Sequence, residues 1–124
     1  MRIKEIAFTG YPVTDMKRAR SFYEEVLGLS KSRHWGDDKA PTWVEYDIGE
    51  GCLAIILDDD GDWPPANAGP AAALEVDDFD GSINKLKTAG VTFHSEPQET
   101  PVCWMAIVLD PDRNRLGIHR RKNS

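Results

Sequence analysis

The sequence predicts an α+β fold made of two βαβββ modules, 1–57 and 70–120, joined by a linker at 58–69. Two observations lead to this prediction. A capped amphipathic helix with a glycine stop lies between apolar strands near the N-terminus, and the same order of elements returns roughly 60 residues later. Because each module is too small to bury a core alone, we expect the two to pack together as one domain over residues 1–124.

The first module opens with an apolar stretch, Ile3–Phe8, and is built around one helix predicted between Asp15 and Gly28. Asp15 or Thr14 can cap the free amide groups at its start, and Gly28 can take the left-handed conformation that ends a helix. Apolar residues recur at three- and four-residue steps and form one stripe: Met16, Ala19, Phe22, Tyr23, Val26 and Leu27. This stripe must lie on an apolar surface.

Three strands follow this helix. The first is predicted at Leu29–Trp35, before a turn at 36–39. Alternating β-branched and aromatic residues predict the second at Thr42–Ile48, and a glycine-containing turn leads into the third, Cys52–Leu57. The linker after them has the acidic, glycine and proline content of a solvated connector. Its acidic residues do not have the spacing of a calcium loop, so we interpret it as a linker only.

The second module repeats this order. A short strand, Ala71–Val76, leads into a helix that Asp77 or Asp78 caps and Gly90 ends. Further strands are predicted at Val91–His94, Val102–Leu109 and Leu116–Arg120, with turns at Pro97–Pro101 and Asp110–Asn114.

Composition is typical of a soluble globular protein, with 40% hydrophobic and 29% charged residues. The net charge of −6 argues against nucleic-acid binding, because no basic stripe can neutralise phosphates. The sequence has no pattern of a signal peptide or membrane span. Cys52 and Cys103 are too few and too far apart for a disulfide framework. We therefore expect a cytoplasmic protein with reduced thiols, without nucleic-acid or membrane partners.

Three separated motifs resemble the vicinal oxygen chelate superfamily, which includes glyoxalase I, bleomycin-resistance proteins and extradiol dioxygenases. They are the strand, Asp and helix unit with Phe22-Tyr23 and Leu27-Gly28-Leu29, the repeat of that unit, and the closing run 110–116. The resemblance implies that the modules form a curled mixed sheet around a cup that holds a small molecule. It also implies a homodimer.

Arg113 departs from this family, which generally has glycine at that position of the final hairpin. If the turn needs a positive φ, an arginine there costs about 1 kcal/mol. A different turn geometry is the simpler alternative.

The resemblance also places four metal-ligand positions, at Phe8, Ile56, Ala71 and Gly117. Metal-dependent members have His, Gln or Glu at these places. None of the four residues here offers an imidazole, carboxylate or thiolate donor. We therefore predict that the protein has no metal cofactor, and we do not expect glyoxalase I or ring-cleaving chemistry.

Because strand side chains alternate between faces, residues two positions away from these four also face the cup. The predicted ligand site has an apolar lining with polar groups near its rim. Its residues are Phe8, Trp43, Ile56, Ala71, Ala73, Glu75, Cys103, Met105, Gly117 and His119. Either parity of the strand 102–109 could face the cup.

His119 and Glu45 are the candidate catalytic residues. An imidazole titrates near neutrality, so His119 could serve as a hydrogen-bond partner or general base; alternatively it is a half-exposed residue of a terminal strand. Glu45 lies in an apolar strand and faces either water or the cup. If the two side chains face one another, they form an acid–base pair.

Three functions fit these observations. We favour a metal-free module that binds a small apolar or aromatic molecule without turnover, as the resistance proteins of the superfamily do. The alternative is a lyase, isomerase or dioxygenase-like enzyme, either metal-independent through His119 and Glu45 or with atypical metal ligands. The third is a partner domain that associates through its sheet edges. The tryptophans can be core residues, dimer contacts or a platform for a flat ligand: Trp35, Trp43, Trp63 and Trp104.

Overall fold

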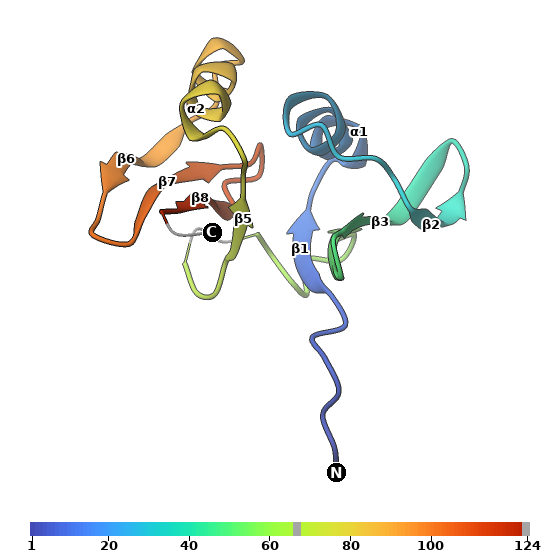
Figure 1. The fold of residues 1–124 in the computed structure, drawn as a ribbon. Helices are drawn as coiled ribbons and strands as arrows, with labels where there is room; N and C mark the ends of the chain where they lie inside the picture. The colour runs from blue at the N-terminus through green and yellow to red at the C-terminus, as the bar shows by residue number, and fades with distance from the viewer. Residues whose placement is uncertain (66–67, 123–124) are drawn as a thin grey trace. The chain divides into compact units, whose positions relative to one another are not determined.

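A computed structural model describes residues 1–65 and 68–122, and the chain divides into two compact units, 1–65 and 66–124. Each unit has the order strand, helix and three strands (Figure 1), which confirms the predicted α+β class and its two βαβββ modules. Residues 66–67 of the predicted linker lie outside the described residues. None of the described helices has the length and apolar character that a membrane crossing requires.

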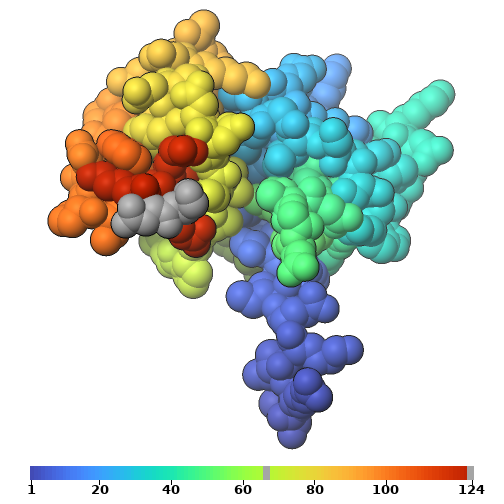
Figure 2. Space-filling model, viewed as in Figure 1, coloured from blue at the N-terminus to red at the C-terminus, as the bar shows by residue number. Residues whose placement is uncertain are grey.

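The first unit contains a four-stranded mixed sheet in the order β1-β4-β3-β2. β1 runs parallel to β4, and the other pairs are antiparallel. The strands are β1 (Thr9–Val13), β2 (Arg33–Asp37), β3 (Ala40–Ile48) and β4 (Gly51–Leu57). The opening stretch Ile3–Phe8 lies outside β1, and the N-terminal residues project away from the first unit (Figure 2).

The helix of this unit begins as predicted but does not continue as one α-helix. Asp15 caps α1 (Met16–Arg20) by accepting a hydrogen bond from the Arg18 amide at 3.0 Å. From there the chain forms a π-helix, η1 (Ser21–Val26), in which the Leu27 amide donates to the Phe22 carbonyl at 2.9 Å. The wider turn brings adjacent side chains closer in direction. Phe22 and Tyr23 are consequently both buried.

One face of the first sheet packs against this helix. Val44 and Tyr46 of β3 are fully buried there, and the rings of Tyr46 and Tyr23 stack with centroids 6.1 Å apart. The Tyr46 hydroxyl also donates to Glu24 at 2.8 Å, which ties η1 to β3. Since side chains alternate along a strand, Trp43, Glu45 and Asp47 of β3 point to the opposite face.

The second unit contains another mixed sheet, in the order β5-β8-β7-β6. Its strands are β5 (Ala72–Glu75), β6 (Phe93–Glu99), β7 (Cys103–Leu109) and β8 (Arg115–Arg121). Asp78 caps α2 (Phe79–Thr88) by accepting from the Gly81 amide at 3.0 Å. The buried residues Ala106, Val108, Leu116 and Ile118 form the apolar layer of this sheet.

The predicted turn at Pro97–Pro101 begins too early, because β6 runs on to Glu99 and only Thr100 and Pro101 of that range lie between the strands. β6 is an edge strand, where a proline removes no hydrogen bond that the sheet needs. Its pairing with β7 shifts register between Ser95 and Gln98, so Pro97 sits within an irregular part of the strand.

The turn between β7 and β8 does require a positive φ: Arg113 has a φ of 70°. The alternative of a different turn geometry is therefore wrong. Asp110, which is 4% exposed, holds the turn by accepting from the amides of Asp112 and Asn114 at 2.9 and 2.8 Å. The Asn114 side chain donates to the other carboxylate oxygen at 2.9 Å. These bonds hold the backbone on both sides of residue 113, so the positive φ there does not depend on the side chain of that residue.

Candidate functional site

Five apolar residues gather on the face of the first sheet that points away from the helix. We call this surface the aromatic face; it consists of Phe8, Trp35, Trp43, Ile56 and Trp63. Strand register places Trp43 between Trp35 on β2 and Ile56 on β4. The Trp43 ring meets Phe8 edge to face with centroids 5.4 Å apart, and Trp35 in the same manner at 6.1 Å.

Gly10 of β1 lets Trp63 reach this face from the segment after β4. A Cβ atom on Gly10 would lie 3.1 Å from both Trp63 and Ile56, which is closer than such contacts normally are. The Trp63 backbone amide also donates to the Asp58 side chain at 3.2 Å, which ties the backbone at Trp63 to the start of the predicted linker. A glycine at this position of β1 therefore makes room for the indole.

The aromatic face leaves much of its apolar surface in water. Trp35 is 53% exposed, Trp63 46% and Phe8 42%. Single exposed apolar residues are ordinary, but a contiguous group of large ones usually marks a binding surface. Aromatic rings that are already held by one another also lose little entropy when a ligand covers them.

A charged cluster lies beside the rings on the same face. Arg33 pairs with Glu45 at 2.5 Å and with Asp47 at 2.6 Å, and the Trp43 indole N–H donates to Glu45 at 2.9 Å. Burial raises the pKa of Glu45, but the bonds from Trp43 and Arg33 outweigh burial and hold that pKa below its usual value. Glu45 is therefore an ionised hydrogen-bond acceptor, and its side chain is only 12% exposed.

Cys52, on the neighbouring strand, does not supply a nucleophile. Burial raises the pKa of its thiol, and the negative charge of Glu45 raises it further. A thiol in these surroundings stays protonated near neutral pH.

In the second unit, His119 and Glu75 form a direct pair. They lie opposite each other on β8 and β5, and His119 Nδ1 is 2.6 Å from Glu75 Oε1. The Arg121 amide donates to Glu75 Oε2 at 2.7 Å. The bond to His119 lowers the pKa of Glu75, with the Arg121 amide as a further cause. A carboxylate on Nδ1 favours the tautomer in which Nε2 carries a free lone pair.

Register places other predicted residues on the same face of the second sheet as this pair. Ala73 lies opposite Gly117, and Met105 lies opposite His119. A Cβ atom on Gly117 would approach Ala73 within 3.2 Å, so glycine is needed where these strands meet. Cys103 shares this parity of β7 and is 6% exposed, whereas Ala71 precedes β5 and is exposed. The odd-numbered residues of β7 therefore share the face of His119, and whether this face lines a ligand site stays a prediction.

The predicted site residues therefore form two groups, one in each unit. Phe8, Glu45, Trp43 and Ile56 share a face in the first, and Ala73, Glu75, Met105, Gly117 and His119 share a face in the second. The acid–base pairing of Glu45 with His119 stays a prediction. Sequence reasoning missed Arg33 and did not assign Trp35 and Trp63 to the site. The position of Trp35 opposite Trp43 depends on the bulge after Trp35, which alternation alone does not reveal.

The four positions at which the resemblance implies metal ligands carry only hydrocarbon side chains or hydrogen, so they do not fit a divalent cation. Among residues 1–65 and 68–122, no group of three His, Cys, Asp or Glu side chains is placed to hold a metal ion.

The family model "Glyoxalase/Bleomycin resistance protein/Dioxygenase superfamily" matches residues 3–118. One similar solved structure is TnmS3, an antibiotic binding protein from Streptomyces sp. CB03234: it is 26% identical, with a TM-score of 0.75, over 98% of this chain and 99% of that chain. Another is a putative glyoxalase family protein from Bacillus anthracis, 21% identical with a TM-score of 0.79, over 98% and 100% of the two chains. The latter shows the fold alone. No curated protein matches the sequence.

Proposed function

Because the chain belongs to the Glyoxalase/Bleomycin resistance protein/Dioxygenase superfamily, we propose that it binds a flat aromatic small molecule on the aromatic face, without a metal ion. The observation that carries this proposal is the contiguous set of half-exposed rings around Trp43. The likeness to TnmS3, an antibiotic binding protein, supports a ligand of that general kind.

The charges beside the rings set a preference among aromatic ligands. Arg33 carries one positive charge, and Glu45 and Asp47 carry one negative charge each. The cluster therefore has a net charge of −1. Both oxygens of Glu45 retain lone pairs that can accept from a ligand N–H or O–H. A neutral or cationic ring system with donor groups at its edge therefore suits this face better than an anionic one.

Proflavine, a flat tricyclic cation with two amino groups, is a suitable probe. We expect it to quench tryptophan fluorescence saturably. Trp35→Ala should weaken its binding about two- to tenfold, because a stacking surface of about 0.5–1.5 kcal/mol is lost. Trp35→Phe keeps a ring and should retain most of the affinity. Trp35 is more than half exposed, so neither variant removes a core residue.

Equal affinity of Trp35→Ala and the parent protein would place the ligand elsewhere and contradict the proposal. Val102→Ala is a matched control, because it removes an exposed apolar side chain of the second unit, 69% exposed, and should leave proflavine binding unchanged.

The His119–Glu75 pair favours one alternative, a metal-independent lyase or isomerase in which Nε2 of His119 accepts a proton from the substrate. In the first unit, the lowered pKa of Glu45 suits a hydrogen-bond acceptor and not a proton donor. Loss of turnover in His119→Asn with ligand binding retained would support this alternative.

We also propose that the protein works as a homodimer in the cytoplasm. Membership of the superfamily and the two free cysteines support this proposal. Light scattering after size exclusion gives the mass in solution, and a mass of one chain would contradict the dimer.

A further inference from the structure

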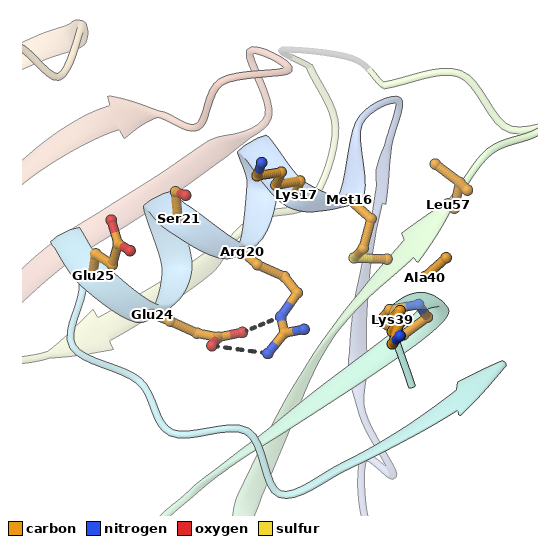
Figure 3. A pocket seen from close by; sticks show the side chains of 10 residues that line it. Met16, Lys17, Arg20, Ser21, Glu24, Glu25, Lys39, Ala40 and Leu57 are labelled. Atoms are coloured by element: carbon orange, nitrogen blue, oxygen red, sulfur yellow. Dashed lines mark hydrogen bonds and ion pairs between the residues drawn. The ribbon is translucent and has the colours of Figure 1, made fainter. Parts of the chain in front are cut away.

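A pocket lies on the helix side of the first unit and shares no residue with the aromatic face. Its volume is about 480 Å³, within the range of about 300–1,000 Å³ of small-molecule sites. One wall is α1 with η1, and the other is formed by the start of β3 and the end of β4 (Figure 3). π-helical turns are rare and are often found at functional sites.

The floor of this pocket is apolar and its walls carry cations. Met16, Pro41 and Leu57 supply hydrocarbon surface, while Arg20 and Lys39 come from opposite walls. Figure 3 shows the Arg20 and Glu24 side chains lying together on the side of the helix that faces Lys39.

The hydrogen bonds of Glu24 leave the pocket with unused donors. Arg20 Nε and Nη2 donate to the two oxygens of Glu24 at 2.6 and 3.1 Å, and Tyr46 donates to Oε2 as well. The described residues offer no acceptor to Arg20 Nη1 or to Lys39 Nζ. The Arg20 side chain is only 29% exposed, so water satisfies it incompletely. Glu25 also lines the pocket, but Figure 3 shows it at the far end of the helical wall from Lys39.

From this arrangement we propose that the pocket binds a small aliphatic carboxylate. Its carboxylate accepts from Arg20 Nη1 and Lys39, and its hydrocarbon body covers Met16, Pro41 and Leu57. A carboxylate suits the site because charge-assisted bonds to guanidinium are roughly twice as strong as neutral ones. An aromatic body is not required, which separates this ligand class from that of the aromatic face.

Octanoate is the probe, and octanamide, which has the same hydrocarbon body without the charge, is its control. In a ¹H–¹⁵N NMR titration, we expect octanoate to shift the resonances of Arg20, Ser21 and Ala40 saturably. Octanamide should bind at least about fivefold more weakly, since it lacks the charge that Arg20 and Lys39 recognise. Equal binding of the two probes, shifts confined to β2 and the aromatic face, or no saturable shift with octanoate would each overturn the proposal.

Two variants sharpen the test. Lys39→Gln removes an exposed cation without touching the core and should weaken octanoate binding about fivefold or more. The double variant Arg20→Gln with Glu24→Gln removes both members of this partly buried pair together, so that no carboxylate is left unpaired. It should abolish the preference for octanoate over octanamide. Lys85→Gln, an exposed change of equal charge on α2, should have no effect. Proflavine binding should survive in Lys39→Gln, so failure of this proposal is distinct from failure of the proposed function.

Discussion

At the scale of single residues, Arg113 carries the clearest local strain. Its φ of 70° is the left-handed region, where an L side chain approaches the neighbouring carbonyl. Glycine avoids this contact because it has no Cβ atom.

Arg113→Gly should therefore raise the free energy of unfolding by about 1 kcal/mol. Urea denaturation measures the change. Arg113→Ala keeps a Cβ atom and is the matched control, for which we expect no gain. An equal gain in both variants would mean that the arginine side chain, and not its backbone conformation, limits stability.

His119 owes its orientation to Glu75. In the neutral imidazole, the carboxylate on Nδ1 should hold the ring in the Nδ1–H tautomer. Glu75→Gln should shift the balance toward the Nε2–H form. Long-range ¹H–¹⁵N correlation spectra report the two nitrogens separately, and an unchanged pattern in Glu75→Gln would show that the pair does not persist in solution.

Both members of this pair were predicted to face the ligand from the alternation of β5 and β8. Their direct contact was not predicted, because it depends on the register that places Glu75 opposite His119. For the same reason the role of Arg33 was missed: its two carboxylate partners lie 12 and 14 residues away in the chain.

At the scale of elements, Glu24 joins the helix to the sheet. Burial raises the pKa of Glu24, but the hydrogen bonds from Arg20 and Tyr46 outweigh burial and lower that pKa below its usual value. A lowered pKa means that the ionised side chain contributes stability above the pKa of the unfolded chain, about 4.5. That contribution is lost as the pH falls through the folded-state value.

Glu24→Gln should therefore lower the free energy of unfolding by about 1 kcal/mol at pH 7. The difference from the parent protein should shrink as the pH falls below about 4.5. Chemical denaturation across this pH range measures it, and Glu25→Gln, a change at an exposed neighbour, is the control. A difference that stays constant with pH would rule out ionisation of Glu24 as its cause.

The elements themselves were largely predictable, because capping residues and alternating strands are local signals. Asp15 and Asp78 both cap helices as expected. The π-helix was not predicted, since the same apolar spacing fits an α-helix. Its wider turn places Phe22 and Tyr23 together on the buried side. The continuation of β6 through Pro97 depends on its edge position, which is a property of the whole sheet.

At the scale of the whole molecule, the repeat in the sequence corresponds to two units with matching strand orders, β1-β4-β3-β2 and β5-β8-β7-β6. The family match over residues 3–118 agrees with the motifs that suggested it. The residue types at the four positions that the resemblance implies for metal ligands can be read from the sequence, because ligand chemistry depends on residue type. The aromatic face was only partly visible, because the sequence does not tell which tryptophans share a surface.

The central claim is that the protein binds an aromatic molecule on hydrocarbon surface and needs no metal ion. Native mass spectrometry of the full chain with proflavine, before and after EDTA treatment, tests this claim most directly. We expect one proflavine per chain, with the same bound fraction in both samples and no metal adduct in stoichiometric amount. A stoichiometric metal ion, together with loss of proflavine when EDTA removes that ion, would contradict it.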